Sequence, residues 1–133
     1  MLFERTGLVM TRICKQTLDG NVETLILAVL ESGPSYGYAI VKQLNRRCDG
    51  ILKLGEGTVY PVLHRLEQKQ MISSKWQSGD NGRPRKYYRL NKKGHKAFAE
   101  NLRQWRMLAS VIERVVGSCG SVLPKPQPKG GII

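Results

Sequence analysis

Residues 71–90 have the sequence MISSKWQSGDNGRPRKYYRL, and this stretch decides the fold class. Residues 71–77 and 85–90 each alternate between two sets of side chains, which is the period of a β-strand. The segment 78–84 between them is rich in Gly, Asn, Asp and Pro, which is typical of a turn. It is too long for a two-residue hairpin turn and favours a projecting loop. The stretch therefore predicts a β-hairpin.

Two helices are expected at the start of the chain. Apolar residues recur at helical spacing between Val22 and Leu30, after a cap at Asp19, and the pattern stops at Gly33-Pro34. A second helix is expected to begin with a cap at Ser35 and to end before Asp49-Gly50. Its apolar side is formed by Ile40, Val41 and Leu44.

A third helix is expected directly before the hairpin. Residues 51–54 are too short for a helix and are predicted to form a minimal strand. The helix then begins with a cap at Thr58, and Pro61 falls in the first turn, where a missing N–H costs little. Its buried side is predicted to consist of Val59, Val62, Leu63 and Leu66.

A long helix is expected to follow the hairpin. From Asn91 onward, apolar residues are separated alternately by four and three positions, which is a heptad-like seam. Gly117 is expected to end this helix, and the Gly, Pro and Lys residues that follow favour a flexible basic tail. The seam consists of Phe98, Leu102, Trp105, Ala109, Ile112 and Val116.

The order helix, helix, short strand, helix, strand, turn, strand, long helix is that of a winged helix-turn-helix. We expect a mainly α fold with a small β-hairpin wing (α+β) and a long C-terminal dimerisation helix. In this fold one helix enters the major groove of DNA while the hairpin reaches phosphates or the minor groove. The expected organisation is an N-terminal extension (1–17), a DNA-binding domain (18–90), the dimerisation helix (91–116) and the tail (117–133).

The charge of the chain points to a polyanionic partner. It has 22 Lys and Arg against 10 Asp and Glu, a formal charge of +12. Nucleic acid and an anionic membrane both fit such a field. Nine cations lie between Arg83 and Arg106 with one opposing glutamate, Glu100, and with Tyr87 and Tyr88 among them, which favours phosphate contacts. The alternative is an edge hairpin that uses Lys and Arg to prevent aggregation.

Several other classes are disfavoured by what the sequence lacks. No apolar run approaches the roughly 20 residues of a membrane span, and no secretory signal is present, so we expect a cytoplasmic protein with no membrane partner. The isolated residues Cys14, Cys48, Cys119, His64 and His95 offer no metal-ligand spacing. The scattered carboxylates form no catalytic cluster, so we expect neither an enzyme nor a cofactor.

Three sequence blocks, in this order, resemble the PadR family of transcriptional regulators. They are GPSYGYAI at 33–40, GTVYPVLHRLE at 57–67 and GRPRKYYRL at 82–90, and the resemblance covers roughly residues 20–115. It implies a compact, single-domain homodimeric repressor that binds a palindromic promoter operator in double-stranded DNA. The subunits would be joined by the long C-terminal helix, through Phe98, Leu102, Trp105, Ala109 and Ile112.

The resemblance also assigns roles to residues of the third helix and the hairpin. The segment that starts at Thr58 matches the start of the recognition helix, which makes Tyr60 a base or phosphate contact. Lys86 and Tyr87 match the basic and aromatic pair of the family's wing. The DNA-binding candidates are therefore Thr58, Tyr60, Pro61, His64 and Arg65 in the recognition helix, and Arg83, Arg85, Lys86 and Tyr87 in the wing.

Other roles remain open for some of these residues. Tyr60 could instead be a core aromatic, and His64 could be either a DNA contact or a solvated side chain. Gly37 matches a helical glycine of the family, which suggests close packing or a close approach to DNA. Trp105 is interpreted first as dimer packing, although some relatives bind small aromatic effectors at the dimer interface. Core positions are expected for Tyr36, Tyr38 and Tyr88.

The sequence thus leaves two functions to compare. The first is a sequence-specific regulator, a repressor on a pseudo-palindromic site with half-sites about one helical turn apart. The alternative is an effector-sensing or protein-sensing winged-helix module with only weak, non-specific DNA binding.

Overall fold

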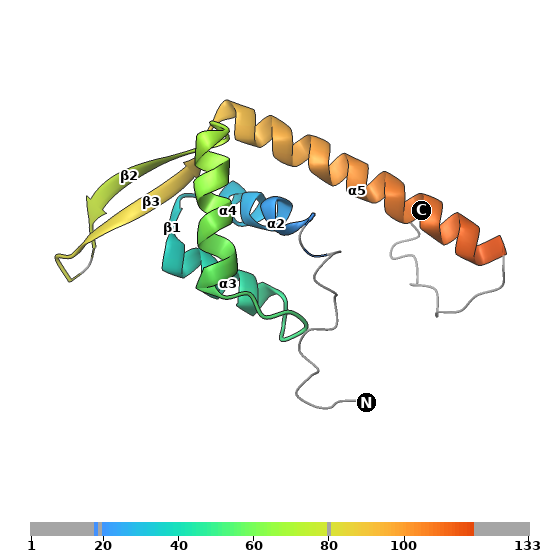
Figure 1. Cartoon of the computed structure of the whole chain (residues 1–133), viewed down its shortest axis with the longest axis horizontal. Helices are drawn as coiled ribbons and strands as arrows, with labels where there is room; N and C mark the ends of the chain where they lie inside the picture. The colour runs from blue at the N-terminus through green and yellow to red at the C-terminus, as the bar shows by residue number, and fades with distance from the viewer. Residues whose placement is uncertain (1–17, 19, 80, 119–133) are drawn as a thin grey trace. The chain divides into compact units, whose positions relative to one another are not determined.

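A computed structural model describes residues 18, 20–79 and 81–118 of the chain (Figure 1). Its helices are α2 (Val22–Glu31), α3 (Gly37–Arg47), α4 (Glu56–Gln68) and α5 (Lys92–Ser118). Its strands are β1 (Ser35–Tyr36), β2 (Ile72–Ser78) and β3 (Pro84–Leu90). This is the expected winged helix-turn-helix order, with three helices before the hairpin and a long helix after it.

The core lies between α2, α3 and α4 and has the composition that the helical periods predict. The fully buried side chains Ile26, Ile40 and Leu63 come one from each helix. All the apolar positions predicted to face inward from α3 and α4 are buried. Phe98 of α5 packs against the edge of this core, together with Tyr88 and Leu90 of β3. The helical stripes therefore determine how the three helices meet.

The short strand is not where the sequence predicts it. Ser35 was expected to cap the second helix, but Ser35 and Tyr36 form β1, which pairs with Tyr88 and Tyr87 of β3. The sheet order is β1-β3-β2. The helix starts after Tyr36, without a side-chain cap. Pairing with β3 satisfies the backbone of this segment, and the Ser35 hydroxyl accepts a 3.5 Å hydrogen bond from the side-chain amide of Gln43 instead of capping the helix.

Residues 51–54 form a loop and not the predicted strand. Leu52 and Leu54 are buried, while Ile51 is exposed. The amide of Asn45 takes the place of a strand partner: its Oδ1 accepts the Leu54 N–H at 2.7 Å and its Nδ2 donates to the Leu54 carbonyl at 2.9 Å. One side chain of α3 therefore satisfies both backbone groups of Leu54.

Helix α4 begins three residues earlier than expected. Gly55 is the N-cap, and its carbonyl accepts the N–H groups of Thr58 and Val59. The predicted cap at Thr58 is therefore wrong, and Pro61 lies in the second turn rather than the first. Gly55 is extended, and no side chain caps this helix. Asp19, the cap predicted for the first helix, lies outside the described residues.

The chain divides into two compact units between Glu100 and Asn101. Helix α5 continues through Gly117 to Ser118, so the predicted end at Gly117 is wrong. A glycine costs a helix only about 1 kcal/mol relative to alanine, which the last turn tolerates. The predicted extension at 1–17 and nearly all of the predicted tail, from 119 onward, lie outside the described residues.

Candidate nucleic-acid interface

Helix α4 presents a continuous exposed row opposite its buried stripe. The side chains on this row are small, aromatic or polar, with His64 one turn after Tyr60. All the recognition-helix candidates of the sequence analysis are exposed, namely Thr58, Tyr60, Pro61, His64 and Arg65. Because Pro61 has no N–H, the carbonyl of Gly57 lacks its usual partner within the helix. Because its side chains are exposed, the row has the accessibility that contact with a DNA groove requires.

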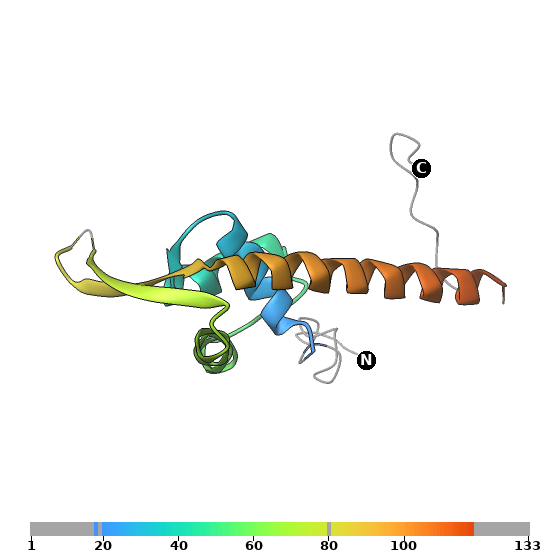
Figure 2. The same cartoon turned by 90° about the horizontal axis from the view of Figure 1, so that it is seen from above.

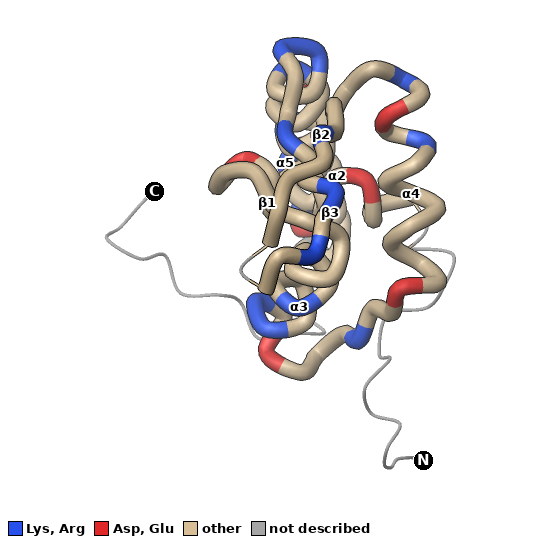
Figure 3. Tube along the Cα trace, turned by 90° about the vertical axis from the view of Figure 1, so that its left-hand side faces the viewer, with Lys and Arg blue, Asp and Glu red and all other residues tan. Residues whose placement is uncertain are grey.

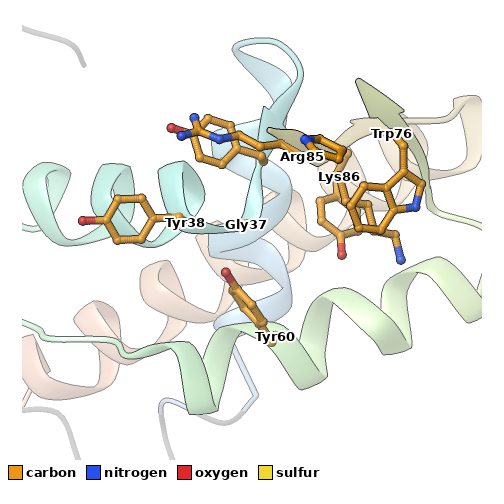
Figure 4. A pocket seen from close by; sticks show the side chains of 9 residues that line it. Gly37, Tyr38, Tyr60, Trp76, Arg85 and Lys86 are labelled. Carbon is orange, nitrogen blue, oxygen red and sulfur yellow. The ribbon is translucent and has the colours of Figure 1, made fainter. Parts of the chain in front are cut away.

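Tyr60 is not a core residue, because 44% of it is exposed. Its ring extends from α4 to the start of α3, where a Cβ on Gly37 would lie 2.9 Å from the ring and from its hydroxyl (Figure 4). The pKa of the Tyr60 phenol is raised, mainly by burial and then by the negative charge of Glu56 and by Tyr88. The phenol therefore stays protonated and can donate a hydrogen bond at neutral pH.

Arg65 occupies a different part of the α4 surface. Its Nε lies 3.5 Å from a carboxylate oxygen of Glu23 in α2, and the same oxygen accepts a 2.9 Å hydrogen bond from Nζ of Lys69. Both cations remain about half exposed. Of the recognition-helix candidates, Arg65 is thus the one that also holds α4 against α2.

The hairpin of β2 and β3 extends beyond the helices that form the core, as two perpendicular views show (Figures 1 and 2). Its strands are paired from Ile72 with Leu90, at the base, to Ser78 with Pro84. The loop is closed by hydrogen bonds from Gly79 N–H to the Arg83 carbonyl and from Gly82 N–H to the Gly79 carbonyl. The projecting loop predicted from the sequence is confirmed.

The four wing candidates do not share one face of the hairpin. Arg85 and Tyr87 lie on the face that packs against Tyr36 of β1: the Arg85 guanidinium lies 4.3 Å from the centre of the Tyr36 ring, which meets the Tyr87 ring edge-on. Lys86 lies on the opposite face. Arg83, in the loop, is exposed. The predicted basic and aromatic pair, Lys86 and Tyr87, is therefore divided between the two faces of the hairpin.

Lys86 points toward α4. Its Nζ lies 3.5 Å from Oε1 of Glu67 and 5.5 Å from the centre of the Tyr88 ring. The other carboxylate oxygen of Glu67 accepts a hydrogen bond from the Ser74 hydroxyl of β2. Sequence reasoning missed this contact, because nothing in the period of α4 indicates that Glu67 faces the hairpin.

An open cleft of about 460 Å³ lies between the start of α3, the exposed row of α4 and the hairpin (Figure 4). Its lining is mainly aromatic with two cations, and consists of Tyr36, Gly37, Tyr38, Tyr60, Trp76, Pro84, Arg85, Lys86 and Tyr88. It therefore brings together three of the predicted DNA contacts, Tyr60, Arg85 and Lys86.

Two aromatic residues of this cleft were not identified as candidates from the sequence. Trp76 of β2 is 66% exposed and lies across the hairpin from Lys86. Tyr38, expected in the core, is 51% exposed, and its ring lies 5.4 Å from Nζ of Lys42. The core prediction is wrong for Tyr38 because the side chain follows the solvent side of α3, whereas Tyr88 packs against the core as expected. The period-2 position of Trp76 beside a basic strand was the available signal.

Lys and Arg recur along β3 and its loop (Figure 3). From residue 69 to residue 96 the sequence contains nine Lys and Arg and a single acidic residue, Asp80. Glu56 and Glu67 supply the negative charge of α4. A cationic hairpin beside an exposed helix row matches the charge that a phosphate backbone requires.

The second unit offers an apolar helix face. Along residues 101–118, Trp105, Leu108, Val111, Ile112 and Val115 are each more than half exposed. Leu102 and Ala109 are intermediate in exposure. Apolar side chains of this size on one side of a helix are characteristic of a surface that packs against another helix.

Within the described ranges, no helix is long and apolar enough to cross a membrane. Nor does any group of three or more His, Cys, Asp or Glu side chains lie close enough together there to hold a metal ion.

Comparison with known proteins agrees with this architecture. A transcriptional regulator from Clostridium thermocellum has a structure similar to this one, with a TM-score of 0.71 and 32% identity over 78% of this chain and 98% of that one. The structure of a PadR-like transcriptional regulator from Bacillus cereus is also similar, with a TM-score of 0.68 and 27% identity. The match covers 77% of this chain and 97% of that one. The transcriptional regulator YqjI of Escherichia coli is 24% identical over 110 residues, and the chain spans half of its length.

The fold, the exposed row of α4 and the basic hairpin define a winged-helix transcriptional regulator. Residues 26–100 match the transcriptional regulator PadR-like family, which is more than half of the chain. The chain belongs to this family. The family and the similar structures are transcriptional regulators and not enzymes, and the same holds for this protein.

Proposed function

We propose that this regulator binds a pseudo-palindromic operator as a homodimer and represses transcription by occupying the promoter. The observation that carries the proposal is the exposed row of α4 beside a cationic hairpin. A helix of this kind fits the major groove of B-DNA, and a basic hairpin beside it fits the adjacent phosphates or the minor groove.

The roles of the side chains follow from where they lie. Tyr60 and His64 contact base edges or phosphates from the row of α4. Arg83 and Arg85 contact phosphates from the wing, and Tyr87 supports Arg85 through Tyr36, whose ring both of them contact. Arg65 adds charge at the side of α4 that faces Glu23.

The apolar face of α5 supports the homodimer. Exposing Trp105 and Ile112 to water is unfavourable, by about 25 cal/mol for each Å² of apolar surface, and pairing with the same face of a second copy removes that cost. A two-fold dimer would place two copies of α4 in successive major grooves, roughly 34 Å apart.

Selection of duplexes from a random-sequence pool tests the proposal. The protein should enrich a two-fold symmetric sequence with half-sites about one helical turn apart. Arg85→Ala should weaken binding to the selected duplex and to a scrambled one alike, whereas Tyr60→Ala should also reduce the ratio between them. Arg47→Ala is the matched control: it removes a cation from the far end of α3, about 15 Å from the cleft, where Arg47 donates to Ser32. Absence of any enriched sequence would contradict the proposal.

Repression requires a separate measurement. A reporter promoter that overlaps the selected duplex should lose transcription when the protein is present, and recover it with Tyr60→Ala. An increase in transcription would assign activation instead.

The aromatic side chains favour one second candidate, the sensing of a small aromatic effector. Trp105 is 54% exposed on α5, and Trp76 lines the cleft. Titration of tryptophan fluorescence with flat aromatic acids, in Trp76→Phe and Trp105→Phe variants, would show which of the two surfaces binds. If the titrations show no binding while the selected duplex binds tightly, this second function is excluded.

A further inference from the structure

Glu67 connects the helix of the candidate interface to both strands of the wing. Its carboxylate accepts the Ser74 hydroxyl of β2 at 2.5 Å with one oxygen and lies 3.5 Å from Lys86 Nζ of β3 with the other. The side chains of Lys86 and Glu67 are 35% and 30% exposed, so water screens the pair only in part. We call Glu67, Ser74 and Lys86 the wing brace.

The wing brace reaches beyond the part of the hairpin that packs against the core. Ile72 and Leu90 anchor the hairpin at its base, and Tyr88 also packs against the core. Lys86 lies two residues beyond Tyr88, which is about 7 Å of strand. On the opposite face Arg85 stacks on Tyr36. The hairpin is therefore held from two sides, and the wing brace connects it directly to the Glu67 side chain of α4.

The sign of the charge makes the role of Glu67 testable. A carboxylate near phosphates repels them, so neutralising Glu67 would by itself strengthen DNA binding. If Glu67 instead sets the angle of the wing, its neutralisation should weaken specific binding, in which helix and wing must contact DNA together.

We propose that Glu67 is a positioning residue that fixes the wing relative to α4, and that Lys86 serves this brace rather than a phosphate. The inference rests on the proposed DNA binding. Lys86 then differs from Arg83 in a measurable way: a phosphate contact releases counterions and contributes to the salt dependence of binding, whereas a residue of the wing brace does not.

The first experiment measures affinity for the selected and the scrambled duplex over a range of salt concentrations. Glu67→Gln and Lys86→Met should each lower affinity for the selected duplex about threefold to tenfold, in the range of a partly buried charged interaction. Neither variant should change the salt slope, which is the slope of log affinity against log salt concentration. Arg83→Met should reduce that slope by about 0.9. The double variant of Glu67 and Lys86 should lose no more than either single variant.

Glu56→Gln is the matched control, because it removes the same charge from the same helix without touching the wing. It should leave binding unchanged or strengthen it. The proposal is overturned if Glu67→Gln behaves like Glu56→Gln, or if Lys86→Met lowers the salt slope as Arg83→Met does.

A second experiment needs no DNA. In the free protein, amide hydrogen exchange at 73–77 and 86–88 should be faster in Glu67→Gln than in wild type, at an unchanged exchange rate in α2 and α3. Equal exchange in the hairpin would overturn the wing brace even if DNA binds. Conversely, faster exchange with no specific duplex for the wild type would uphold the brace and reject the proposed function.

Discussion

Gly37 of α3 and Tyr60 of α4 fit together because Gly37 has no side chain: a Cβ there would lie 2.9 Å from Cε1, Cζ and the hydroxyl oxygen of Tyr60. The atoms that would collide are at the far end of a side chain that can rotate, so the ring would move rather than the backbone. Gly37 therefore controls where the phenol of the candidate interface points.

Gly37→Ala should weaken DNA binding without loss of stability. Alanine is the better helix former by up to about 1 kcal/mol, so thermal unfolding should change little or improve slightly. Displacement of Tyr60 should reduce affinity for the selected duplex about tenfold, the size of one lost contact. In a Tyr60→Ala background the same substitution should have no further effect, and an additive loss would show that Gly37 acts elsewhere.

The raised pKa of Tyr60 predicts a change in stability at alkaline pH. The folded state raises this pKa above its ordinary value of about 10, chiefly by burial. Below about pH 10 the phenol is protonated in both states, so its contribution to stability is complete there. As the pH rises from the pKa of the unfolded chain through the higher folded-state pKa, the unfolded chain ionises first and this contribution is lost.

The free energy of unfolding, measured by chemical denaturation, should therefore fall more steeply above about pH 10 in wild type than in Tyr60→Phe. Below about pH 10, the free energies of unfolding of the two proteins should change with pH in parallel. Parallel curves across the alkaline range would contradict the raised pKa.

The apolar face of α5 should control the oligomeric state. Ile112→Glu places a carboxylate on that face, and burying it unpaired costs several kcal/mol, so the dimer should dissociate to monomers. Ser110→Glu is the matched control, because it introduces the same residue on the opposite side of the same helix. Sedimentation velocity should show monomers for the first variant and dimers for the second; two equal dimers would place the interface elsewhere.

Asn45 should matter for stability more than its exposed neighbours on α3. Asn45→Ala removes both hydrogen bonds to the Leu54 backbone and leaves that backbone without these partners, which should cost about 2 kcal/mol. Asn45→Asp keeps the acceptor for the Leu54 N–H and should lose less. Urea denaturation measures both costs, and an equal cost would show that the bond from the Leu54 N–H to the side-chain oxygen contributes little.

Local patterns predicted the elements and the family, but not how the elements contact one another. The stripes of α2, α3 and α4 follow from a period of 3.6 residues, and the hairpin follows from a period of two, so each could be recognised in a short window. The basic character of the hairpin was equally local. The errors lie at Ser35, whose backbone pairs with β3, and at residues 51–54, where Asn45 of α3 satisfies the Leu54 backbone. A third error lies at the start of α4, which follows the extended residue Gly55 and not a hydroxyl cap.

What the sequence alone determined is therefore the order of the helices, the wing and the exposed row that carries Tyr60. The tertiary structure decided which side chains meet across that order: Ser35 with Tyr88 in a strand, Gly37 with Tyr60 at the cleft, and Glu67 with Lys86 beneath the wing. The physical reason is that these contacts join residues between 19 and 53 positions apart. No periodic pattern extends over such separations, and only the packing of the core brings the partners together.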